Sequence, residues 1–250
     1  MTKLVQMYSA RNFTPWPAVL DEVKKNGFYG VEGYSENYKD PDAFRSMLDE
    51  RGLTMPQGHF DLDMVETDIA RAFDVARKLG IETIIVPWLA PEERPVDQAG
   101  WHSLGLRLAA IGKKVTEEGF GFAWHNHDFE LTPVEGGAIP MEILLEAAPG
   151  LRWEADLGWI LRAGGDPLTW LDAYAERIIS VHIKDLQENP DSALEGGWAD
   201  LGHGVNEWAP IFNKLNLLPQ LQAYVAEHDD PADFSRFLRR WSDSFDRLRE

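Results

Sequence analysis

The chain of 250 residues contains no cysteine, which excludes disulfide bonds and thiolate metal sites. Any metal ion must therefore be held by histidine and carboxylate side chains. Long uncharged hydrophobic runs are absent too, and the first residues, MTKLVQMYSA, have too short an apolar stretch for a signal peptide. We therefore expect a cytoplasmic protein with no membrane partner.

Basic residues are scarce relative to acidic ones, with 24 Lys and Arg against 42 Asp and Glu and a formal net charge of -18. Nucleic-acid backbones are bound by clustered Lys and Arg, so this balance argues against a nucleic-acid partner. A doubly charged phosphate substrate is also disfavoured unless a local basic pocket overrides the global field. A small neutral sugar or polyol fits the surface better. Composition leaves the oligomeric state open, a homo-oligomer included.

Short apolar segments alternate with longer amphipathic ones along the whole chain. Residue patterns predict strands at 3–8, 29–34, 53–60, 82–88, 119–127, 151–156, 178–184 and 221–227. Helical patterns, several ending on Gly or Asn, cover 16–27, 42–52, 68–80, 103–119, 138–148, 167–176, 207–216 and 232–249. Eight such pairs, in units of about 30 residues, predict an α/β fold, a single (β/α)8 TIM barrel domain over 1–250. A doubly wound open sheet is the alternative.

Four successive late strands end on side chains that can bind a metal. These are His125 and His127 in WHNHDFE, Asp156 in WEADLGW, His182 in VHIKD and Glu227 in YVAEHDD. A lone His or Asp at a strand end is usually a hydrogen-bonded loop residue, but four strands that share this feature are hard to obtain by accident. The carboxyl ends of barrel strands meet at one mouth, where barrel enzymes place their active site. We therefore expect a divalent cation at the C-terminal mouth of the strands.

Alternation along the strand at 178–184 decides which side chains point into the barrel. His182 is expected to face inward with two polar neighbours, Ser180 and Lys184. The intervening apolar residues are expected to face the helical layer, namely Ile179, Val181 and Ile183.

Five motifs in chain order carry a resemblance to a known family. WHNHDFE, ADLGWILRAGGDP, VHIKD, LGHGVNEW and a last strand that ends on Glu are similar to the xylose isomerase-like superfamily of sugar phosphate isomerases and epimerases. The resemblance covers the whole chain and is strongest from residue 119 to residue 230. It implies a divalent metal ion (Mn, Mg, Co or Zn) held by side chains of the fifth to eighth strands.

Carried over residue by residue, the resemblance implies that Asp156, His182 and Glu227 are metal ligands. Ketose epimerases have a Glu on the fifth strand, where this chain has His-Asn-His, so their two-glutamate mechanism does not transfer directly. We assign His125 to the metal and His127 to proton transfer, and the reverse assignment stays open. Glu227 is also expected to be catalytic.

Lys184 is the third expected catalytic residue, because it shares a face with His182 and is placed to hold a substrate oxygen. The alternative is a buried ion-pair partner for Asp128 or Glu130. Further residues are assigned to substrate binding: Glu32 and His59 by the resemblance, Trp88 and Trp159 because aromatic faces stack on sugar rings, and His203 as part of a long loop over the mouth.

Such a site favours a metal-dependent carbohydrate isomerase or epimerase. A divalent cation on the carbonyl and a neighbouring hydroxyl stabilises the enediolate formed when the adjacent proton leaves, and a His or carboxylate takes that proton. The alternative is a lyase on the same scaffold, a dehydratase of an inosose or 3-keto-sugar. A catalytically silent sugar-binding barrel and an endonuclease-like repair enzyme are further alternatives, and the acidic charge disfavours the last.

Overall fold

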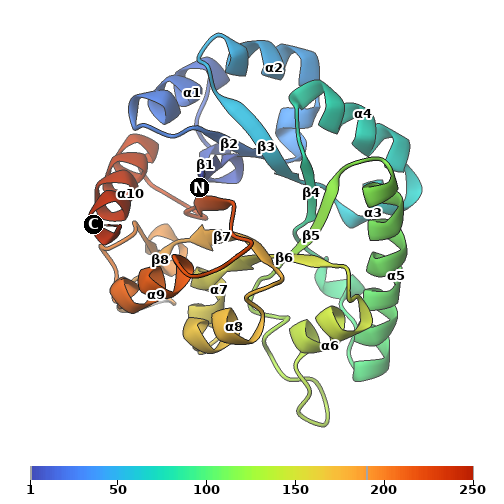
Figure 1. Ribbon diagram of the computed structural model, residues 1–250. Coiled ribbons are helices and arrows are strands. Elements are labelled where there is room, and N and C mark those ends of the chain that lie inside the picture. Colours follow the sequence, from blue (N-terminus) through green and yellow to red (C-terminus); the bar gives the residue numbers. More distant parts are fainter. Residues whose placement is uncertain (1, 190, 250) are drawn as a thin grey trace.

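The computed structural model describes residues 2–189 and 191–249. Its main strands are β1 (Thr2–Gln6), β2 (Gly30–Gly33), β3 (Thr54–His59), β4 (Thr83–Val86), β5 (Gly121–His125), β6 (Arg152–Asp156), β7 (Ile178–Ile183) and β10 (Ala223–Ala226). All neighbours pair in parallel and close into a barrel in the order β1-β10-β7-β6-β5-β4-β3-β2 (Figure 1). The predicted (β/α)8 barrel is confirmed, each strand lying within the predicted range or one residue beyond it.

Helices form the outer ring around the strands (Figure 1). Those predicted from periodicity are α1 (Trp16–Lys25), α2 (Pro41–Asp49), α4 (Ile69–Leu79), α5 (Gln98–Glu117), α6 (Pro140–Ala147), α8 (Pro167–Ala173), α9 (Trp208–Leu215) and α10 (Phe234–Leu248). None of the helices in the described part of the chain has both the length and the apolar character needed to cross a membrane.

Several short elements were not predicted. They are α3 (Leu62–Thr67), α7 (Leu157–Arg162), the antiparallel pair β8 (Asp185–Leu186) and β9 (Trp198–Ala199), and the 3-10 helices η1 (Met7–Ala10), η2 (Ser35–Tyr38), η3 (Pro91–Glu93) and η4 (Leu194–Gly197). Helix α7 follows β6 without a loop, because the carboxylate of Asp156 caps it by accepting from the Trp159 N–H.

Apolar side chains on the outer faces of the strands pack against the helices. Val181 and Ile183 belong to this layer, as predicted. The prediction for Ile179 is wrong, because this side chain packs with Ile85 and Ala123 in a separate small cluster. The cause is a register shift between β6 and β7 at this point, which interrupts the alternation of the strand.

Polar side chains occupy the centre of the barrel, where branched apolar residues are usual. The buried polar residues of the inner strand faces are Gln6, Glu32, Gln57, His125, Glu154, Asp156, Ser180 and His182. Buried polar groups are costly unless they are hydrogen-bonded or bind an ion. This part of the fold is therefore the place to look for a functional site.

Candidate metal centre and active site

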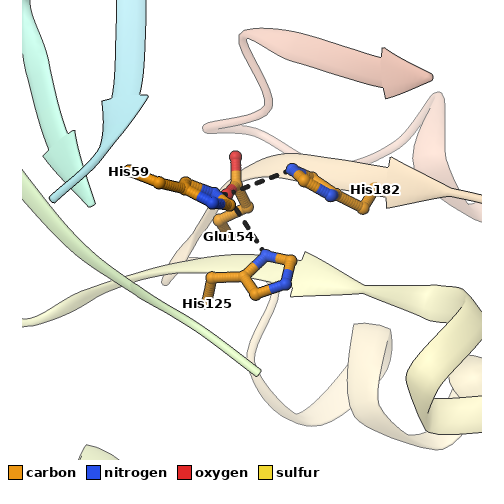
Figure 2. Close-up of side chains that lie close together, drawn as sticks. All are labelled: His59, His125, Glu154 and His182. Atoms are coloured by element: carbon orange, nitrogen blue, oxygen red, sulfur yellow. Dashed lines mark hydrogen bonds and ion pairs between the residues drawn. The ribbon is translucent and has the colours of Figure 1, made fainter. Parts of the chain in front are cut away.

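Two overlapping groups of side chains could hold a metal ion, and in each group the ligand atoms lie within 4.8 Å of one another. The mouth cluster consists of His125, Asp156, His182 and Glu227. The inner cluster consists of His59, His125, Glu154 and His182, and Figure 2 shows these side chains converging. The four metal ligands expected from the sequence are thus brought together, and a second set overlaps them.

Glu154 is the hub of the inner cluster. Its Oε2 atom lies 2.7 Å from His59 Nε2, 3.2 Å from His125 Nδ1 and 3.2 Å from His182 Nε2 (Figure 2). Burial alone would raise the pKa of the Glu154 carboxyl, but His182 and the hydrogen bonds from the histidines outweigh it and hold the pKa well below its usual range. Glu154 is therefore an ionised carboxylate surrounded by imidazoles.

Two neutral side chains bond the other oxygen of Glu154. Its Oε1 atom accepts hydrogen bonds from Gln57 Nε2 at 2.6 Å and from Ser180 Oγ at 2.7 Å. The same Gln57 amide donates to Glu32 Oε2, so it joins the two buried carboxylates. Glu32 Oε1 lies 2.8 Å from His182 Nε2, so Glu32 and His182 belong to the same hydrogen-bond network.

The mouth cluster contains a carboxylate oxygen without a hydrogen bond. Asp156 Oδ2 is buried, has no hydrogen-bond partner in the described part of the chain, and lies 3.7 Å from His125 Nε2 and 3.8 Å from His182 Nδ1. Glu227 Oε2 lies 2.8 Å from His182 Nδ1. A buried carboxylate oxygen that accepts no hydrogen bond, is paired only with the Lys184 ammonium 3.0 Å away and lies beside two imidazole nitrogens fits a cation, because His and carboxylate are ligands that divalent transition metals accept.

Lys184 supplies positive charge beside this cluster. Its fully buried Nζ atom lies 2.7 Å from Glu227 Oε2, 3.0 Å from Asp156 Oδ2 and 2.8 Å from Asp229 Oδ2. Burial would lower the pKa of Lys184, but Asp156 and the other carboxylates raise it above its usual range. The ion-pair partners of Lys184 are these three carboxylates, so the alternative pairing with Asp128 or Glu130 is wrong.

Burial sets the charge of the remaining groups. It lowers the pKa of His125 to about 3, with a further contribution from His182, and it raises the pKa of Asp156 to about 7. Burial would likewise raise the pKa of Glu227, but Lys184 and His182 hold it well below its usual range. His125 is therefore a neutral imidazole with a lone pair to offer.

A cavity of about 500 Å³ opens next to these side chains. Its walls include six of the residues expected in the site, namely His59, Trp88, His125, His127, Trp159 and Glu227. Four others are fully buried and outside the lining: Glu32, Asp156, His182 and Lys184. His203 is exposed and not part of the lining, so the structure does not bring it to the cavity.

His127 lines the cavity next to both His125 and Trp159, with ring centroids 5.2 and 5.1 Å apart. Its backbone N–H donates to Glu130 Oε2 at 2.9 Å, which fixes the turn after β5. Burial, and then His125, lower the pKa of His127 well below its usual range. The imidazole is therefore neutral, with a lone pair on one ring nitrogen.

Sequence reasoning missed two carboxylates of the site, Glu154 and Asp229. Each lies two residues from an expected ligand, Glu154 before Asp156 and Asp229 after Glu227. Strand alternation places Glu154 on the same face of β6 as Asp156 and was the available signal for it. Asp229 lies beyond the end of β10, so alternation gave no signal for this residue.

A closed barrel with a histidine–carboxylate cluster at the carboxyl ends of its strands defines the class of this protein. The chain belongs to the xylose isomerase-like TIM barrel family, whose model matches residues 20–248. Curated relatives include the rhizopine catabolism protein MocC of Rhizobium meliloti, 23% identical over 239 residues that cover 81% of this chain and 71% of the relative. An inosose dehydratase of Geobacillus kaustophilus is 26% identical over 232 residues, covering 79% and 74%.

Solved structures show the same fold at lower identity. A sugar phosphate isomerase/epimerase from Parabacteroides distasonis superposes with a TM-score of 0.79 at 18% identity, covering 97% of this chain and 92% of the other. The IolI protein, solved with a bound zinc atom, superposes with a TM-score of 0.78 at 11% identity, covering 100% and 98%.

Proposed function

We propose that this chain is a divalent-metal-dependent enzyme that removes a proton next to the carbonyl group of a sugar or keto-polyol. The observation that carries the proposal is the convergence of two imidazoles and two carboxylates in the mouth cluster, beside a cavity lined by a neutral histidine. Membership of an enzyme-containing family and the zinc atom in the structure of IolI support it.

The hydrogen bonds accepted by the carboxylate oxygens of the two clusters favour the mouth cluster over the inner cluster as the metal site. In the inner cluster the Glu154 oxygens face N–H and O–H groups, which already use their electron pairs. In the mouth cluster Lys184 and His182 contact Glu227 Oε2, but Asp156 Oδ2 accepts no hydrogen bond and is paired only with Lys184, 3.0 Å away. We therefore assign the metal to His125, Asp156, His182 and Glu227, with Mn, Mg, Co and Zn all compatible with such ligands.

A divalent cation held by these four residues would supply a Lewis acid for the substrate carbonyl and for the charge that develops on its oxygen. His127 takes the proton from the neighbouring carbon, a role that contributes about 100- to 10,000-fold to a rate. Trp88 and Trp159 pack against the apolar face of the ring. Lys184 lies outside the cavity lining, so we give it the role of holding Asp156 and Glu227 in place.

We propose elimination of the β-hydroxyl as the outcome. His127 accepts the proton, the carbon–oxygen bond breaks, and the hydroxyl leaves with that proton as water, which makes a dehydratase. Glu227, the second base that an epimerase would use, is engaged by Lys184 and His182. The inosose dehydratases among the curated relatives support this outcome and a keto-inositol-like substrate. Isomerisation or epimerisation is the second candidate, favoured by the likeness to the Parabacteroides protein.

Nuclear magnetic resonance in heavy water tests the proposal. Metal-loaded protein is incubated with a panel of inososes, 3-keto-sugars and ketohexoses. Loss of water from one of them supports the dehydratase, and deuterium uptake with an unchanged formula supports the isomerase. Binding of these compounds without solvent exchange at any carbon would indicate a silent binding barrel and contradict the proposal.

A further inference from the structure

We propose that Glu154 is a positioning residue that fixes which nitrogen of His125 and of His182 is free for the metal. The proposal rests on the metal site proposed above. Both imidazoles lie between the two clusters. His125 directs Nδ1 to Glu154 and Nε2 to Asp156, and His182 directs Nε2 to Glu154 and Nδ1 to Glu227. Each ring therefore offers one nitrogen to each cluster.

A neutral imidazole carries one N–H group and one lone pair, and a metal needs the lone pair. The proton must therefore lie on the inner nitrogen of each ring, which is Nδ1 in His125 and Nε2 in His182. Glu154 Oε2 lies 3.2 Å from both of these atoms and is the carboxylate oxygen that they share, while Glu32 Oε1 makes a further contact of 2.8 Å with one of them, His182 Nε2. The opposite tautomer would point a lone pair at a carboxylate and an N–H group at the metal.

Neighbouring donors hold Glu154 in the acceptor role. The Gln57 amide and the Ser180 hydroxyl bond Oε1, while Oε2 is left for the imidazoles. The Glu154 side chain is fully buried, as are Ser180 and His182, so water does not compete for these atoms. A carboxylate enclosed in this way can discriminate between tautomers, because a lost charge-assisted hydrogen bond inside a protein is costly.

Gln6 fixes the tautomer of His59, the third imidazole of the inner cluster. The Oε1 atom of Gln6 accepts from the Tyr8 N–H, so its amide nitrogen faces Glu32 Oε1 at 2.5 Å and His59 Nδ1 at 3.2 Å. His59 Nδ1 then accepts, and its Nε2 carries the proton toward Glu154. Of the three imidazoles around Glu154, His59 bonds Oε2 at 2.7 Å, and the inner nitrogens of His125 and His182 each lie 3.2 Å from the same oxygen.

Zinc affinity of the full chain, measured by competition with a chromophoric chelator, tests the inference. Glu154→Gln leaves one acceptor oxygen for donors that two carboxylate oxygens contact in the wild type. We therefore expect zinc affinity to fall about 10- to 100-fold, as for other partners of metal-bound histidines. Ser180→Ala is the matched control, because Gln57 still bonds Glu154 Oε1 in this variant and each histidine keeps its carboxylate oxygen. Its zinc affinity is expected to stay close to that of the wild type.

The nitrogen-15 spectrum of histidine-labelled, metal-free protein reports the tautomer directly. We expect His125 to carry its proton on Nδ1 in the wild type and in Ser180→Ala, and to show a mixture or the reverse in Glu154→Gln. Should Glu154→Gln fail to fold, Glu32→Gln takes its place, since it removes the other acceptor 2.8 Å from His182 Nε2 and should also weaken zinc binding.

The outcomes separate the two proposals. A wild-type chain that binds no zinc rejects the proposed metal site itself. A wild type that binds zinc while Glu154→Gln binds it equally tightly overturns the positioning role. Weaker binding with an unchanged His125 tautomer overturns it too, because the loss would then be merely structural.

Discussion

His182 is flanked by carboxylates at both ring nitrogens, with Glu32 at 2.8 Å from Nε2 and Glu227 at 2.8 Å from Nδ1. Burial would lower the pKa of His182, but the surrounding carboxylates, Glu154 first, raise it well above its usual range. Without a metal the ring therefore carries the positive charge of this site. With a metal at Nδ1, the cation takes over that role.

Replacement of His182 by Ala is expected to remove bound metal and turnover together, because it deletes a ligand and leaves the facing carboxylates unpaired. Metal content by mass spectrometry and turnover of the substrate found in the heavy-water screen are the two measurements. His102→Ala, which removes an exposed histidine of α5, is the control. Full turnover in His182→Ala would refute the assignment.

Replacement of His127 by Gln is expected to separate the two properties. The side chain lines the cavity, and none of its atoms belongs to either candidate metal cluster. We expect kcat to fall about 100- to 10,000-fold through loss of the base, while metal content stays that of the wild type. A kcat within a few-fold of the wild type would show that another group takes the proton.

The candidate ligands could be predicted from the sequence because each follows a strand whose end is visible in the apolar pattern. The roles of the neighbouring acids could not. Glu154 and Asp156 share a face of β6, and only the contacts with other strands show that Glu154 accepts hydrogen bonds whereas Asp156 Oδ2 accepts none and is paired with Lys184. The ion-pair partners of Lys184 could not be predicted either, because they lie on β6 and on the segment after β10.

At the scale of elements, one buried carboxylate organises the segment after β7. Asp185 Oδ1 accepts from the backbone N–H groups of Leu186 and Asn206, and Oδ2 accepts from those of Gly202 and Gly204. The chain at Gly204 runs so close that a Cβ atom would lie 2.2 Å from the Leu186 carbonyl oxygen. The Asp185 side chain therefore helps to tie this loop to the end of β7.

Asp185→Ala is expected to lower the free energy of unfolding by about 2–4 kcal/mol, because several backbone N–H groups lose a charged acceptor. Urea unfolding followed by circular dichroism measures the change. Asp191→Ala, which alters an exposed side chain of the same loop, is expected to stay within about 0.5 kcal/mol of the wild type. Equal stabilities of the two variants would mean that Asp185 does not hold the loop.

Strands and the longer helices could be predicted because their apolar periods are local. Helix α7 could not, since it begins directly after the last residue of β6 and its N-cap, Asp156, is hidden within a predicted ligand motif. The inward packing of Ile179 also depends on pairing between β6 and β7, which strand alternation alone does not contain.

At the scale of the whole molecule, acidic groups are enclosed in the barrel. Glu32, Glu154, Asp156 and Glu227 are all buried, and Lys184 is the one buried ammonium in the described part of the chain. Buried charge is tolerated when it is paired or binds a metal. The fold should therefore gain stability from a divalent cation.

Zinc or manganese added to chelator-treated protein is expected to raise the melting temperature. A metal concentration 100 times the dissociation constant stabilises the folded state by about 2.7 kcal/mol, a shift of roughly 5–11 °C for a domain of this size. Differential scanning fluorimetry measures it, with His182→Ala as the variant that should not respond. The same shift in that variant would place the metal elsewhere.

Anomalous scattering at the manganese or zinc edge, from crystals grown with that metal, tests the central claim most directly. The account predicts one strong peak among His125 Nε2, Asp156 Oδ2, His182 Nδ1 and Glu227 Oε2. A peak among His59, Glu154 and the inner nitrogens of the other two histidines, or no peak in the barrel, would contradict it.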